Sequence, residues 1–360
     1  MMKIRDLHLS ITRFLAYLSV IIVFFSSGCL SSEVQNHSLD ISMPEDWIFE
    51  TNGFIISTPF VNSDTVVVGS GDSYVYALDS GTGDLKWSFQ TNGPVYSSPI
   101  VDGEMVFVGS HDETMYALDS DEGTLIWSFK TAGPLYASPR VSDDTLYFGS
   151  GDGVLYAADK TDGTIKWTFE TDALIVTTPL VHDGVVYTGS CDYNIYAIDE
   201  RTQELLWTVK TNEAVVSSPI IEDEVLFVGS HDKNLYAINI ENGEVKWTFE
   251  TEDYLQSSPA VYVDMVLFGS DDDSFYSVDK KSGQLLWEYS TNNSIFSSPI
   301  VYNDIVYFGS GKSLYGLNVL NGENVWKYET GDVIYSSPRV SCDKLVFGSY
   351  DRKLYSMNLL

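Results

Sequence analysis

Residues 77–87 read ALDSGTGDLKW, and related segments return along most of the chain. Each copy ends in a tryptophan, and neighbouring tryptophans lie 40 residues apart except for a final step of 39. The eight tryptophans are Trp47, Trp87, Trp127, Trp167, Trp207, Trp247, Trp287 and Trp326. A fixed period of this length is the signature of a repeat architecture, so it decides the fold.

Three further landmarks recur at the same step, and in the first unit they are Pro59, Gly69-Ser70 and Tyr76. Each unit reads as four short strands; in the second unit we predict strands over 95–101, 105–110, 114–119 and 125–130. No helical period interrupts them. Four strands in about 40 residues match one propeller blade, which predicts an all-β, eight-bladed β-propeller with four-stranded antiparallel blades.

The phase of the repeat predicts how the ring closes. The chain ends at Leu360, after the third strand of a unit, and the missing fourth strand is present at the other end, around Trp47. We therefore expect the N-terminal strand to complete the last blade, which removes the free sheet edges.

Turn residues give finer expectations. An aspartate such as Asp112 follows seven of the Gly-Ser pairs and is predicted to cap the turn between strands two and three. The seventh unit has Gly311-Lys312 there and is one residue short, which predicts a tighter loop. Gln203 replaces the glycine of the turn between strands three and four, so that turn is expected to differ.

The N-terminal residues have the features of a targeting segment. Basic residues precede an apolar run at 14–25, which predicts a signal peptide over 1–28. The run ends in Ser-Ser-Gly before Cys29 and resembles a lipobox, although Ser26 departs from the usual aliphatic residue. We expect a lipidated Cys29 and a flexible tether over 29–45, the propeller over 46–360, and a location on the outer face of a membrane, at the cell surface or in the periplasm. A simply cleaved signal or an uncleaved anchor is the alternative.

The net charge of −31 argues against a nucleic-acid partner and against a basic membrane-binding patch. Cys29, Cys191 and Cys342 are far apart and form no metal-ligand cluster, so no metal site is predicted. His111, Cys191, His231, Asp271 and Tyr350 share one turn position. The histidines are expected to be exposed, and the run at 271–273 is expected to be a solvated turn.

Alternate residues of each innermost strand should face the central channel. The candidate binding residues at such positions are Arg140, Arg339, Tyr96, Tyr136, Phe296 and Tyr335. The arginines could bind an anion or a peptide carboxylate, or could simply reach channel water. The aromatic residues could bind a peptide or planar ligand, or could simply pack the channel mouth.

The segment at 77–87, repeated at 117–127 and 157–167, resembles the tryptophan-docking motif of pyrroloquinoline-quinone (PQQ) repeat propellers. The resemblance covers about residues 47–360 and implies eight blades with a structural tryptophan between each pair. The family includes quinoprotein dehydrogenases and non-enzymatic lipoproteins such as outer-membrane-assembly propellers. The dehydrogenases carry long insertions, an adjacent pair of cysteines and a calcium cluster with a catalytic aspartate, none of which occurs in this sequence.

We therefore predict a non-enzymatic, monomeric propeller lipoprotein that binds a protein or peptide partner at the cell surface, without a cofactor and without catalytic residues. A PQQ-dependent dehydrogenase is the first alternative. A polysaccharide-binding surface module is the second, because exposed aromatic rings bind sugars.

Overall fold

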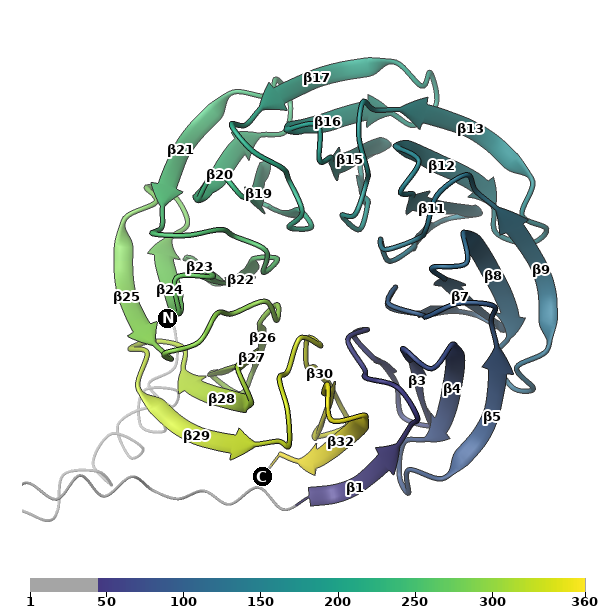
Figure 1. Cartoon of the computed structure of the whole chain (residues 1–360). Coiled ribbons are helices and arrows are strands. Elements are labelled where there is room, and N and C mark those ends of the chain that lie inside the picture. The colour runs from purple at the N-terminus through teal and green to yellow at the C-terminus, as the bar shows by residue number, and fades with distance from the viewer. Residues whose placement is uncertain (1–44, 360) are drawn as a thin grey trace, which may run out of the picture. The chain divides into compact units, whose positions relative to one another are not determined.

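Eight four-stranded antiparallel sheets surround a central channel in the computed structural model (Figure 1). The structure describes residues 45–359, so the predicted signal peptide, Cys29 and nearly all of the predicted tether lie outside the described residues. No helix within 45–359 has the length and apolar character needed to cross a membrane. The prediction of an all-β, eight-bladed propeller is confirmed.

In blades 1 to 7 the strands run in sequence from the channel outwards, and in blade 8 the first strand of the chain takes the outermost place. Blade 1 contains β2 (Phe60–Val61), β3 (Thr65–Gly69), β4 (Tyr74–Asp79) and β5 (Leu85–Gln90). Blade 2 contains β6 (Ile100–Asp102), β7 (Met105–Gly109), β8 (Thr114–Asp119) and β9 (Leu125–Lys130). Blade 3 contains β10 (Arg140–Ser142), β11 (Thr145–Gly149), β12 (Val154–Asp159) and β13 (Ile165–Glu170). Blade 4 contains β14 (Leu180–His182), β15 (Val185–Gly189), β16 (Asn194–Asp199) and β17 (Leu205–Lys210).

The second half of the ring repeats this order. Blade 5 contains β18 (Ile220–Glu222), β19 (Val225–Gly229), β20 (Asn234–Asn239) and β21 (Val245–Glu250). Blade 6 contains β22 (Ala260–Tyr262), β23 (Met265–Gly269), β24 (Ser274–Asp279) and β25 (Leu285–Ser290). Blade 7 contains β26 (Ile300–Tyr302), β27 (Ile305–Ser310), β28 (Ser313–Asn318) and β29 (Asn324–Glu329). Blade 8 contains β30 (Arg339–Ser341), β31 (Lys344–Gly348), β32 (Lys353–Asn358) and β1 (Glu45–Glu50).

The first strand of the chain closes the ring, as predicted. β1 lies antiparallel to β32, with Trp47 opposite Ser356 and Glu50 opposite Lys353. Figure 1 shows β1 as the outer strand of the blade that holds the C-terminal strands. The two ends of the chain therefore share one sheet, and the outermost position of blade 8 is filled.

The innermost strands are shorter than predicted. In blade 2 the expected strand over 95–101 is reduced to Ile100–Asp102. The preceding residues bond to the neighbouring blades instead: the Val95 N–H donates to the Ser70 carbonyl at 3.0 Å, and the Ser98 N–H donates to Ser138 Oγ at 3.0 Å. Pro99 has no N–H to offer a ladder. An extended segment that bonds to two neighbouring blades shows the same alternation of apolar residues as a strand. This explains why the predicted strand was too long.

The tryptophans lie between blades. Trp87 is buried, and its Nε1 donates to the Ser120 carbonyl of the next blade at 2.9 Å. Six indoles make this kind of bond: those of Trp47, Trp87, Trp127, Trp207, Trp247 and Trp287. A Cβ built on Gly123 would lie 2.5 Å from Cδ2 of Trp87, so the ring packs directly on the glycine of the next turn.

Two turn predictions have opposite outcomes. In blade 7, Ser310 pairs with Ser313 across a two-residue loop, so the tighter loop is confirmed. The different turn predicted at Gln203 is wrong. Gln203 takes the left-handed φ of 63° that glycine has elsewhere, and its N–H donates to the Asp199 carbonyl at 2.8 Å, as Gly123 does to Asp119 at 2.9 Å. The hydrogen bonds of the turn outweigh the strain that a side chain adds there.

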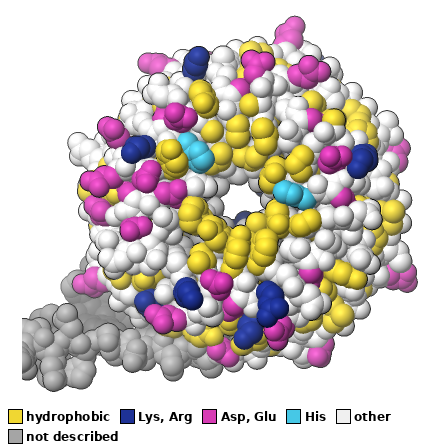
Figure 2. Space-filling view, in the orientation of Figure 1, with side chains coloured by type: hydrophobic (Ala, Val, Ile, Leu, Met, Phe, Trp, Pro, Cys, Tyr) yellow, Lys and Arg dark blue, Asp and Glu magenta, His cyan; other side chains and the backbone are white. Residues whose placement is uncertain are grey.

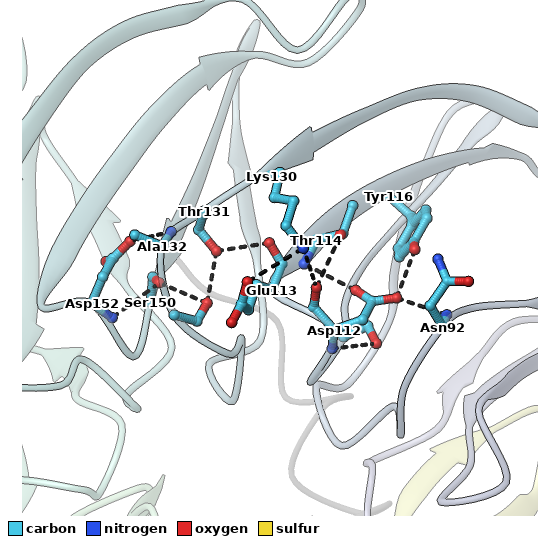
Figure 3. Close-up of polar contacts among 12 residues, drawn as sticks. Asn92, Asp112, Glu113, Thr114, Tyr116, Lys130, Thr131, Ala132, Ser150 and Asp152 are labelled. Atoms are coloured by element: carbon cyan, nitrogen blue, oxygen red, sulfur yellow. Dashed lines mark hydrogen bonds and ion pairs between the residues drawn. The ribbon is translucent and has the colours of Figure 1, made fainter.

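The aspartate that follows a Gly-Ser pair does more than cap its turn, as Asp112 shows (Figure 3). Asp112 Oδ1 accepts the Thr114 N–H at 3.0 Å, which is the predicted cap. Asp112 Oδ2 accepts the Tyr116 hydroxyl at 2.7 Å and the N–H of Asn92, in the segment from blade 1, at 2.8 Å. Burial and this hydrogen bond raise the pKa of Tyr116 to about 12. One carboxylate thus joins two blades.

We predict that Asp112→Ala lowers the free energy of unfolding by about 2 kcal/mol, because the Tyr116 hydroxyl and the Asn92 N–H lose their acceptor. The measurement is urea unfolding followed by circular dichroism. Asp121→Ala, which changes an exposed aspartate in the outer turn of the same blade, is the matched control and should be nearly neutral. Equal losses in the two variants would contradict the bridging role.

Candidate binding site at the channel mouth

Alternation along the innermost segment of each blade decides which side chains enter the channel. In blade 3, Tyr136, Ser138 and Arg140 are exposed or half-buried, whereas Ala137 and Pro139 between them are buried. Since innermost segments surround the channel (Figure 1), the accessible set faces it. The other predicted positions, Tyr96, Phe296, Tyr335 and Arg339, fall in the same accessible set.

Seven rings form a continuous series at the mouth, which we call the aromatic arc. Neighbouring ring centroids lie 4.4 to 5.5 Å apart. In order the members are Phe296, Tyr335, Tyr350, Phe54, Tyr96, His111 and Tyr136. They come from blades 7, 8, 1, 2 and 3 and the segments between them. Figure 2 shows hydrophobic side chains gathered around this opening, with two histidines among them.

The arc joins the predicted aromatic residues and adds others. Phe296 contacts Tyr335 at 4.7 Å, whereas Tyr96 and Tyr136 meet through His111, at 4.6 and 4.4 Å. The expectation of an exposed His111 is wrong: the imidazole is half-buried between two tyrosines, and burial lowers its pKa. The sequence did hold a sign of this placement, because His111 shares its turn position with Tyr350. Phe54 was missed, because it precedes the alternating segment.

The opposite side of the mouth is more polar. His231 stacks on Tyr254 at 4.7 Å. Gln256 Nε2 donates to Asp271 Oδ2 at 2.7 Å, and Asp271 Oδ1 is buried without a hydrogen-bond partner among residues 45–359. Burial raises the pKa of Asp271 to about 6, against the bond from Gln256. The predicted solvated turn is therefore wrong at Asp271, whose carboxyl is half-buried against Gln256.

Asp271→Asn should stabilise the protein at pH 7.5 and have no effect at pH 4. The folded-state pKa is raised, so the contribution of Asp271 to stability is complete below about pH 4 and is lost as the pH rises through about 6. The amide removes the buried charge. Melting temperatures at the two pH values measure the effect, with Asp273→Asn in the same turn as control. If Asp271→Asn changes the melting temperature by the same amount at pH 4 and at pH 7.5, the assignment is wrong.

The two arginines occupy one level of the channel wall. Arg140 pairs with Tyr147 and Arg339 pairs with Val346, which are equivalent positions in blades 3 and 8. Both side chains are exposed to the channel, and no carboxylate among residues 45–359 forms an ion pair with either. Burial nevertheless lowers the pKa of Arg339, because the surrounding channel wall displaces water from the guanidinium.

The polar side chains at this mouth do not fit the quinone and calcium site that the resemblance to quinoprotein dehydrogenases implies. Within 45–359, no three side chains of His, Cys, Asp or Glu lie close enough together to hold a metal ion. Asp271 has an amide, not a second carboxylate, as its hydrogen-bond partner. Cys191 and Cys342 are free thiols in blades 4 and 8.

Residues 20–310 match the family model described as the beta-propeller of the beta-alanine-activating enzyme. The chain belongs to this propeller family. The match supports the resemblance to PQQ repeats. No curated protein matches the sequence.

Solved structures share the fold of this family member. BamB from Moraxella catarrhalis superposes with a TM-score of 0.77 at 18% identity, covering 88% of this chain and 100% of that one. The computationally designed Ika8 protein gives 0.77 at 16% identity, covering 86% and 98%. A europium-containing methanol dehydrogenase gives 0.76 at 14% identity, covering 90% and 94%. One fold thus serves proteins of different kinds, and function has to be argued from the site.

Proposed function

We propose that this chain is a non-enzymatic binding propeller that holds a protein or peptide partner at its channel mouth. The aromatic arc carries the proposal. Tyr136 and Tyr350 each leave 37% of their surface exposed, although Tyr136 contacts His111 edge-on and Tyr350 stacks on Phe54. Rigid aromatic surface that is partly exposed supplies binding energy at a small entropic cost, which is why tyrosine is enriched at interfaces.

The surroundings of the arc favour an extended polypeptide as the partner over the flat surface of a folded protein. The arc spans five blades, and the opposite rim offers polar groups in Gln256 and Asp271. A peptide lying across the mouth would place apolar side chains on the arc and backbone amides on the polar rim. The structural likeness to BamB, a propeller of the same architecture, is consistent with this use.

The location follows from the N-terminal sequence and belongs to the same proposal. Cleavage after residue 28 and lipidation of Cys29 would anchor the chain, and 29–45 would hold the propeller away from the bilayer. The propeller would then act as a monomer on the outer face of the membrane, without a cofactor.

Site-specific photocrosslinking in the native membrane tests the proposal. Benzoylphenylalanine in place of Tyr350 should capture the same partner as benzoylphenylalanine in place of Tyr136. The control position is Leu285, which is 49% exposed on the outermost strand of blade 6 and should not capture that partner. Phe54→Ala, which interrupts the arc between Tyr350 and Tyr96, should reduce the capture.

Two outcomes would overturn the proposal in favour of its alternatives. Saturable binding of PQQ with calcium-dependent, dye-linked alcohol oxidation would make the chain a dehydrogenase. Capture of polysaccharide, with protein crosslinks equal at Tyr350 and Leu285, would make it a carbohydrate-binding module.

A further inference from the structure

Two blades carry the same five-residue pattern on the channel wall. Residues 136–140 read YASPR and residues 335–339 read YSSPR, whereas the equivalent last position in the other six blades is apolar. The alternate residues of this pattern face the channel, so a tyrosine, a serine and an arginine follow one another inwards from the mouth. At about 3.3 Å per residue, the arginine lies roughly 13 Å from the tyrosine.

The serine level forms a ring of hydrogen bonds between blades. A backbone N–H of one blade donates to the hydroxyl of the next at 2.9 or 3.0 Å, at six of the eight junctions. The hydroxyls that accept belong to Ser98, Ser138, Ser218, Ser258, Ser298 and Ser337. A serine hydroxyl that accepts a bond still has its own hydrogen to donate.

The ring is open at the two remaining junctions. The next residues there are Thr178 and Thr58, and neither hydroxyl accepts a bond from the preceding blade. Among residues 45–359, the N–H groups of Ser138 and Ser337 have no acceptor. Backbone N–H groups in folded proteins normally have a partner, so these two donors are free to bond water or a ligand from the channel.

The open junctions and the arginines coincide. Ser138 and Ser337 lie two residues before Arg140 and Arg339 on the same strand face. The neighbours of each arginine around the ring are apolar: Ile100 and Leu180 flank Arg140, and Ile300 and Phe60 flank Arg339. The next level holds two carboxylates: that of Asp102, which is paired with Lys160 at 2.5 Å, and that of Glu222 in blade 5. Around the arginines, the wall thus offers N–H and O–H donors and positive charge.

We propose that this level of the channel binds oxyanions, carboxylate or phosphate groups, at two equivalent positions: one is formed by Arg140 with the donors of Ser138, and the other by Arg339 with the donors of Ser337. Guanidinium groups recognise such oxygens through paired N–H donors, and neutral donors nearby complete the set. The protein is otherwise strongly acidic, with a net charge of −31, so this positive, donor-rich level is a local exception. The site is separate from the aromatic arc and does not depend on the partner proposed for it.

Calorimetric titration of the full chain with inorganic phosphate tests the site. We expect saturable binding of phosphate at two positions, one weakened about 10-fold or more by Arg140→Gln and the other by Arg339→Gln. Arg201→Gln, in an exposed outer turn, is the matched control and should leave binding unchanged. Unchanged melting temperatures would show that the channel variants are folded, and Arg140→Lys should restore part of the affinity.

A second titration separates two sources of the oxyanion. The peptide Phe-Gly-Gly-Gly is compared with a free and with an amidated C-terminus, since four residues span the distance from the mouth to the arginines. A preference for the free carboxylate that the double variant Arg140→Gln, Arg339→Gln abolishes assigns the site to a peptide end. Phosphate binding without that preference assigns it to a free anion. Absence of both, or binding that survives unchanged in the double glutamine variant, overturns the site.

Discussion

Deletion of residues 46–51 should abolish the cooperative stability of the propeller, at a cost of at least about 5 kcal/mol. The segment is the outer strand of blade 8, and it holds Trp47, which is 8% exposed and donates to the Ser80 carbonyl of blade 1 at 3.0 Å. Loss of a buried tryptophan alone costs about 3–5 kcal/mol. The deletion also removes the ladder to β32 and the ion pair of Asp46 with Lys344 at 2.5 Å.

Urea unfolding followed by circular dichroism measures this loss, because the fluorescence of the deletion variant also changes with the missing indole. The matched control is Ile48→Thr, a change in the same strand at a side chain that is 42% exposed. It should shift the free energy of unfolding by about 0.5 kcal/mol or less. A deletion variant as stable as this control would mean that blades 1 and 8 hold together without β1, and the closure argument would fail.

The repeat predicted the fold well because its landmarks report on different contacts. The tryptophan marks the packing between blades, the Gly-Ser pair marks the turn after the second strand, and both follow from residues close in sequence. The phase of the two chain ends then determined which strand had to close the ring. The innermost strands were harder, since residues such as Val95 and Ser98 bond to other blades over separations that a local pattern does not report.

The sequence predicted where the candidate site lies, but it did not predict all the residues and contacts that form the site. Counting equivalent positions placed Tyr96, Tyr136 and Arg140 on the channel side, because alternation is a property of the backbone. The contacts of His111 and the burial of Asp271 depend on side chains that neighbouring blades bring together. The open junctions at Ser138 and Ser337 depend on the threonine in the following blade, a relation across 40 and 279 residues that becomes visible when the ring is closed.

The second large effect is expected at the contact between Trp87 and Gly123. Gly123 has a φ of 68° and lies under the Trp87 ring, where a Cβ would meet Cδ2 and Cε3 at 2.5 Å. Those atoms belong to a buried, hydrogen-bonded indole that cannot move without opening the junction between blades 2 and 1. Gly123→Ala should therefore cost about 3–5 kcal/mol, comparable with the loss of the tryptophan itself.

Gly103 separates the two causes of this loss. Its φ is 59°, also left-handed, but no atom lies within 4 Å of a Cβ built there. Gly103→Ala should cost about 1–2 kcal/mol, which is the backbone strain alone. The difference in free energy of unfolding between the two alanine variants measures how tightly the tryptophan is held. If both variants lose the same stability, backbone strain explains the glycine and the indole contact contributes little. If Gly123→Ala is the costlier by about 2 kcal/mol, close packing of one ring on one glycine is a main contact that joins each blade to the next.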